Sequence, residues 1–147
     1  MIFRILMITG FLVSCCLLIT NCKSAPSAQD KLYDQVMEIH DAVMPEMSTI
    51  HRLRKALKTI DTVADTTIDM RTISYHRQQL DKADEAMMSW MASFENPTAD
   101  TTPETAMAYL ENEKKQITEV RDLMLNSIAA AKQVLDKANL NKEKMNN

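Results

Sequence analysis

The sequence predicts an all-α protein, an antiparallel up-down-up three-helix bundle with coiled-coil-like packing, on the strength of three observations. Apolar residues recur at helical spacings of three, four and seven through most of the 147 residues. The chain after Cys22 contains no Gly and no Cys, which disfavours the tight turns of hairpins and barrels. Two short polar connectors divide the pattern into three long segments, and short connections make neighbouring helices antiparallel.

The first 21 residues have the character of an export signal. Their apolar run, at 5–19, is too short for a comfortable membrane-spanning helix, and small polar residues follow Cys22. An apolar run that ends in a Cys before a polar tether resembles a bacterial lipoprotein signal, in which the Cys carries lipid. Cys22 is therefore the predicted lipidation site. Cys15 is the alternative, because the residues before it fit that signal better than Asn21 does.

The chain divides into four predicted parts with one folded domain. These are a lipoprotein-type signal peptide at 1–21, a lipidated Cys with its tether at 22–29, a helical bundle at 30–140 and a frayed tail at 141–147. The helices are expected at about residues 28–60, 68–95 and 103–139.

The first expected helix carries one apolar face and one interruption. The face consists of Leu32, Val36, Ile39, Val43, Met47, Ile50, Leu53, Leu57 and Ile60. Ser27 and Asp30 have the spacing of a capping box, which predicts where the helix begins. Pro45 lacks a backbone donor and crowds the preceding turn, so we expect a kink near Met44.

The other two helices show the same periodicity. The expected core positions are Ile73, Leu80, Ala83, Met87, Met91 and Phe94 in the second helix, and Leu110, Ile117, Val120, Met124, Ile128, Ala131, Leu135 and Ala138 in the third. Arg77 and Asp81 are expected to form an exposed i,i+4 pair. Pro103 suits the first position of the third helix.

Enzymatic chemistry finds no support in the sequence. The chain has three His residues, and no Ser-His-Asp, His-Glu-x-x-His or phosphate-binding motif surrounds them. Carboxylate pairs such as Glu111 with Glu113 follow the polar face of a helix, so we interpret them as solvated. We predict that the protein is not an enzyme and has no catalytic residue.

Methionine is the one compositional anomaly, with 12 residues in the chain. At about 100° per residue, one arc of about 80° on the first helix holds Met37, His40, Met44, Met47 and His51. Thioethers and imidazoles are the ligands that Cu(I) prefers. Packing alone also explains the methionines and is the preferred interpretation, because Met fills irregular gaps in small cores.

Antiparallel pairing brings more of these ligand types together. Folding near residue 65 places His40 opposite about Trp90, and a second fold near residue 99 brings Met107 beside Met91. The candidate metal ligands are His40, Met44, Met91 and Met107. Cu(I) is the one candidate cofactor. A Met/His-ligated haem is a less favoured variant, because the cluster has only one well-placed His.

Three stretches of the chain, at 40–47, 83–91 and 109–115, include His-Asp-x-x-Met-Pro and Met-Met-x-Trp-Met sequences. Together they resemble a group of small helical lipoproteins of Bacteroidetes-type bacteria, sometimes labelled viral A-type inclusion protein. The resemblance implies a helical lipoprotein and brings no known activity or site residue.

The predicted function is that of a membrane-anchored helical lipoprotein acting as a non-catalytic binding or structural module. Its expected location is the extracytoplasmic, periplasmic side of the cell envelope. The expected partners are the membrane, through the N-terminal lipid, and a protein, through the helix faces. The net charge of −3 disfavours nucleic acid. The alternative function is periplasmic binding of Cu(I) or Ag(I) by the Met/His cluster.

Overall fold

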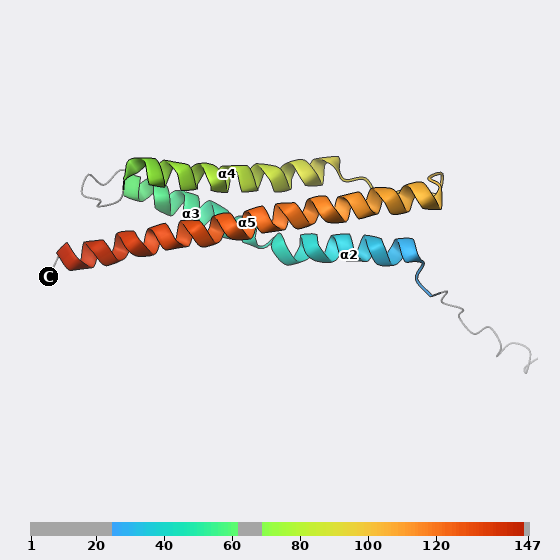
Figure 1. Ribbon diagram of the computed structural model, residues 1–147, viewed down its shortest axis with the longest axis horizontal. Coiled ribbons are helices and arrows are strands. Elements are labelled where there is room, and N and C mark those ends of the chain that lie inside the picture. The colour runs from blue at the N-terminus through green and yellow to red at the C-terminus, as the bar shows by residue number, and fades with distance from the viewer. Residues whose placement is uncertain (1–24, 62–68, 146–147) are drawn as a thin grey trace, which may run out of the picture.

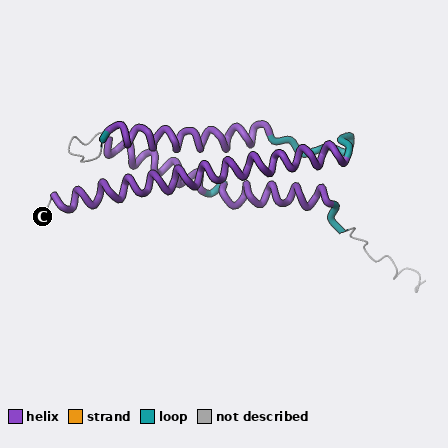
Figure 2. The backbone as a smooth tube through the Cα atoms, viewed as in Figure 1, coloured by secondary structure: helices purple, strands orange, loops and turns teal. Residues whose placement is uncertain are grey.

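All regular structure in the computed structural model is α-helical within the residues that it describes, 25–61 and 69–145 (Figures 1 and 2). The helices are α2 (Ala28–Val43), α3 (Glu46–Asp61), α4 (Met70–Ser93) and α5 (Pro103–Met145). The predicted lipidation site Cys22, its alternative Cys15 and the predicted signal peptide lie outside the described residues.

The helices pack in the predicted up-down-up order. Helices α2 and α3 follow one another in the same direction, α4 runs back along them, and α5 returns beside the others (Figure 1). Helix α5 packs against α2, α3 and α4, and α3 also packs against α4. Because α2 and α3 together form one bent helix, the predicted bundle of three helices is confirmed.

The bend lies at residues 44–45, as Pro45 predicts. The backbone N–H of Met44 donates to the His40 carbonyl at 2.8 Å and closes the last turn of α2. Pro45 has no N–H with which to continue the ladder. The carbonyl of Pro45 accepts instead from the Ser48 backbone at 3.3 Å and from the Ser48 hydroxyl at 2.9 Å, within the first turn of α3.

A capping box starts α2, which confirms the prediction from Ser27 and Asp30. The backbone N–H of Ser27 donates to the Asp30 carboxylate at 2.9 Å, and the Asp30 N–H donates to the Ser27 hydroxyl oxygen at 3.1 Å. Hydrogen bonding of the Asp30 carboxylate by Ser27, first through the backbone and then through the side chain, holds the pKa of Asp30 below its ordinary value of 3.8. The ionised carboxylate therefore stabilises the first turn of α2.

Acidification is expected to loosen this first turn. Because the pKa of Asp30 is lower in the folded state, its contribution to stability is present above 3.8 and is lost as the pH falls through the folded pKa. Replacing Ser27 with Ala should return the Asp30 pKa toward its ordinary value and speed amide exchange at the start of α2. NMR titration of the Asp30 carboxyl measures the first effect, and hydrogen–deuterium exchange of the backbone amides measures the second.

The matched control is Ser74→Ala, at an exposed position of α4. It should leave the Asp30 titration unchanged. Identical Asp30 titrations in the wild type and in Ser27→Ala would contradict a working capping box.

Helix α5 is longer than the sequence predicted. It continues to Met145, whereas the prediction ended it near residue 139 and gave a frayed tail at 141–147. The helix therefore extends beyond its predicted end, and the fraying predicted for 141–147 stays a prediction. The physical reason is the absence of any Gly or Pro after Pro103, in a segment rich in Lys, Glu, Leu and Ala.

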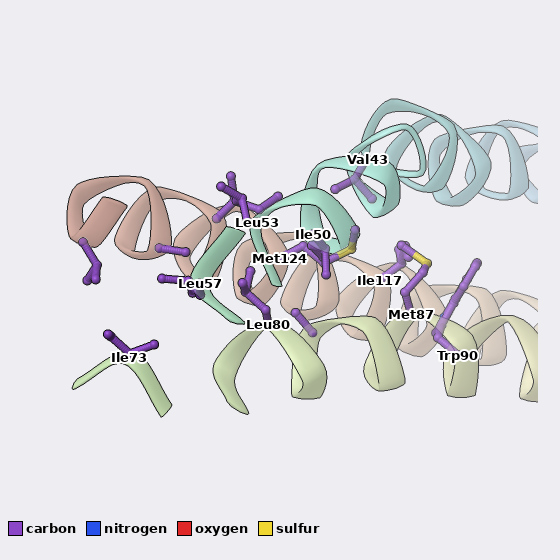
Figure 3. Packing of buried hydrophobic residues seen from close by; sticks show 14 of the residues in the cluster. Val43, Ile50, Leu53, Leu57, Ile73, Leu80, Met87, Trp90, Ile117 and Met124 are labelled. Atoms are coloured by element: carbon purple, nitrogen blue, oxygen red, sulfur yellow. The ribbon is translucent and has the colours of Figure 1, made fainter. Parts of the chain in front are cut away.

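Buried apolar side chains from all four helices form one core (Figure 3). The predicted positions found buried are Val36, Val43, Ile50, Leu53, Leu57, Ile73, Leu80, Ala83, Met87, Leu110, Ile117, Met124, Ile128 and Ala131. Trp90, Ala106 and Val134 are also buried, although the predicted faces omitted them. Most of the helical pattern is therefore confirmed.

Glu113 corrects the interpretation of the carboxylates in α5. It is only 6 % exposed, because it falls three residues after Leu110 and four before Ile117, on the core face. Its carboxylate accepts from the Gln116 side chain at 3.0 Å. Position on the helix, rather than the chemistry of the side chain, decides which residues face the core.

Candidate functional site

Five rings from three parts of the bundle form what we call the aromatic cluster, defined as Tyr33, His40, Trp90, Phe94 and Tyr109. The ring centroids of His40 and Trp90 are 5.5 Å apart, and those of Trp90 and Phe94 are 4.9 Å apart. Phe94 also lies 6.1 Å from Tyr33 and 6.2 Å from Tyr109. The cluster therefore joins α2, the end of α4 and the start of α5.

Local structure brings Phe94 and Tyr109 into this cluster. Phe94 caps α4 with an extended backbone, and its N–H donates to the Trp90 carbonyl at 2.9 Å. The next residue, Glu95, donates its N–H to the Tyr109 hydroxyl oxygen at 2.8 Å. Burial raises the pKa of Tyr109, so its phenol stays neutral and ties the connector to α5.

The predicted pairing of His40 with Trp90 is confirmed by their ring contact. The His40 side chain is 15 % exposed. Its Nδ1 lies 2.8 Å from the Asp41 carboxylate, which can only accept, so we assign the hydrogen to Nδ1. In the neutral ring, Nε2 then carries a lone pair. That atom is buried and has no hydrogen-bond partner among the described residues.

The Trp90 indole has the complementary property. Trp90 is 5 % exposed, and its Nε1–H is a buried donor without a partner in the described part of the chain. Most buried polar groups in proteins are hydrogen-bonded, so two such atoms on neighbouring rings stand out. The His40–Trp90 contact therefore places two buried polar atoms, unpaired among the described residues, in an otherwise apolar region.

The candidate metal ligands do not all reach this contact. Met44 and Met91 are half-buried and pack against the core cluster that contains Trp90. The ring contact between Phe94 and Tyr109 fixes the register of α4 against α5. At 1.5 Å per residue, that register places Met107 about 9 Å along the bundle from Trp90. Met107 is therefore left out of the site developed below.

A second polar cluster links α3 to α4, and the sequence analysis missed it. Arg54 forms ion pairs with Asp81 and, at 3.3 Å, with Asp84. His51 Nε2 lies 3.7 Å from the Asp84 carboxylate. Asp81 was expected to pair with Arg77 in its own helix. The contact across helices needs the register of α3 against α4, which residue spacing along one helix does not supply.

The described part of the chain contains no cluster of nitrogen, thiolate or carboxylate ligands for a metal ion. Nowhere in it do three or more His, Cys, Asp or Glu side chains lie where they could hold a metal ion. Thioethers are a different class of ligand, and those of Met44 and Met91 pack against the core cluster that contains Trp90. None of the described helices has the length and apolar character needed to cross a bilayer.

Comparisons with protein-family models, curated proteins and solved structures found no match to this chain. The resemblance to Bacteroidetes-type lipoproteins stays a prediction.

Proposed function

We propose that the protein is a membrane-anchored, extracytoplasmic helical module that acts by binding or by structure, without catalysis. One observation carries the proposal. The apolar run ends at Cys22, and the chain turns polar there, directly before the capped start of α2 at Ser27. A lipid on Cys22 would hold the bundle close to a membrane through a few tether residues.

The chemistry of the bundle supports a role without catalysis. Its interior is mainly aliphatic, and the ion pairs of Arg54 with Asp81 and Asp84 join α3 to α4. The polar outer faces of the helices are the surfaces that a protein partner would meet. A net charge of −3 gives no basic footprint for nucleic acid. We place the module in the cell envelope, on the periplasmic side.

Replacing Cys22 with Ala is expected to abolish lipid attachment and to release the protein from membranes. Stable anchoring needs more than one acyl chain. The proposed lipid is carried by Cys22, so loss of this residue removes the attachment almost completely. The measurement is incorporation of labelled palmitate in a bacterial host, together with fractionation of the membranes.

Cys15→Ala and Cys16→Ala are the matched controls, and both should keep the label. Label that survives in Cys22→Ala and disappears in Cys15→Ala would move the anchor to the alternative site. A wild-type protein without lipid would refute the anchored module.

A further inference from the structure

We propose that His40 Nε2, with the thioethers of Met44 and Met91, forms a binding site for one soft monovalent metal ion, Cu(I) or Ag(I), beneath the Trp90 ring. This goes beyond the proposed function, because neither membrane anchoring nor a protein partner requires a metal.

The first support is the state of the His40 ring. A metal-ligating His typically donates its other ring N–H to a carboxylate, which fixes the tautomer and the ring orientation. Asp41 does this at Nδ1, at 2.8 Å. The remaining nitrogen, Nε2, is the atom that lacks a partner among the described residues. His40 is therefore already arranged as a ligand.

The second support is the placement of the two thioethers. Met44 follows His40 by one helical turn, a spacing that puts their side chains next to each other. Across the bundle, His51 lies 3.7 Å from Asp84 at the edge where α3 faces α4. Met44 and Met91 are each seven residues from that pair, toward the aromatic cluster, and both pack against the core cluster that contains Trp90.

The third support is the chemistry of the surroundings. Trp90 offers an aromatic face beside His40, and such faces attract cations. Thioethers are neutral, so they can hold a monovalent ion without burying a second charge. Asp41 is 72 % exposed, so its negative charge stays solvated while it supports the His40 ring. This ligand set favours Cu(I) and Ag(I) over hard ions such as Ca²⁺.

The test uses the full-length chain with Cys15, Cys16 and Cys22 each replaced by Ala, so that no thiol competes for the metal. Ag(I) is the first probe, because it needs no reductant. Trp90 is the chain's only Trp, so its fluorescence reports on this site alone. Wild-type fluorescence should change and saturate at one ion per chain. Anaerobic competition with a Cu(I) chelator should then give the Cu(I) affinity.

Four variants separate ligands from packing. His40→Phe keeps a ring beside Trp90 but removes Nε2, and Met44→Leu and Met91→Leu conserve volume. Each should keep the thermal stability and lower the Ag(I) affinity. Asp41→Ala, which removes the positioning carboxylate, should lower the affinity about 10- to 100-fold. Loss of His40 itself should lower it by more.

Met88→Leu is the control, because Met88 is 54 % exposed and lies one turn from Met91 on the same helix. It should leave the affinity unchanged. The proposal is overturned if the wild type shows no saturable response, or if His40→Phe binds Ag(I) as tightly as the wild type. It is also overturned if Met88→Leu weakens binding as much as Met91→Leu. The buried atoms of His40 and Trp90 would then be a packing defect only.

Discussion

Replacing Leu57 with Ala is expected to lower the free energy of unfolding by about 2–5 kcal/mol, because it removes fully buried methyl groups and leaves a cavity. Leu57 has no exposed surface and belongs to the single core that all four helices share. Small domains are stable by only about 5–15 kcal/mol, so this loss is a large fraction of the total. Urea unfolding followed by circular dichroism measures the change.

Leu125→Ala is the matched control, since it makes the same chemical change at a side chain that is 45 % exposed on α5. Its cost should stay near 0.5 kcal/mol, about that of an ordinary surface substitution. In both variants the free energy of unfolding should fall with urea concentration at the wild-type slope, which would show that the unfolded states are comparable. Equal losses at the two positions would contradict the burial pattern.

Trp90→Ala is expected to cost about 3–5 kcal/mol, the range for deleting a buried aromatic side chain. The indole lies between the His40 and Phe94 rings, and its loss disconnects the aromatic cluster between α2 and α4. The same measurement of unfolding in urea gives the loss, with metal-free protein so that ligand binding does not contribute.

Trp90→Phe separates packing from polarity at the same position. The smaller ring gives up some contact, but it also removes the buried Nε1–H, which has no partner among the described residues and so costs about 1–3 kcal/mol. These terms oppose each other, so the net cost should fall below about 1.5 kcal/mol. A Phe variant as unstable as the Ala variant would mean that the indole N–H has a partner in solution.

Helical periodicity predicted most of the fold, because side chains every three or four residues must share one face of any helix. Val36, Val43, Ile50 and Leu57 are buried as that spacing requires, even across the bend at 44–45. The pairing of His40 with Trp90 followed from counting back from the connector, since antiparallel helices keep a constant register.

Other features depend on contacts between helices, which spacing along one helix does not determine. Glu113 looks solvated by its chemistry, yet its position puts it on the core face. Asp81 pairs with Arg54 across the α3–α4 contact. Met107 was paired with Met91 by counting from a fold near residue 99, whereas the contact of Phe94 with Tyr109 sets another register and places Met107 farther along the bundle.

Of the described helices, α5 is the longest and follows the others in the chain. Synthesis proceeds from the N-terminus, and α2, α3 and α4 all pack on the 43 residues of α5. Until α5 leaves the ribosome, the apolar faces of the earlier helices lack their common partner, so the core cannot close before α5 has been made.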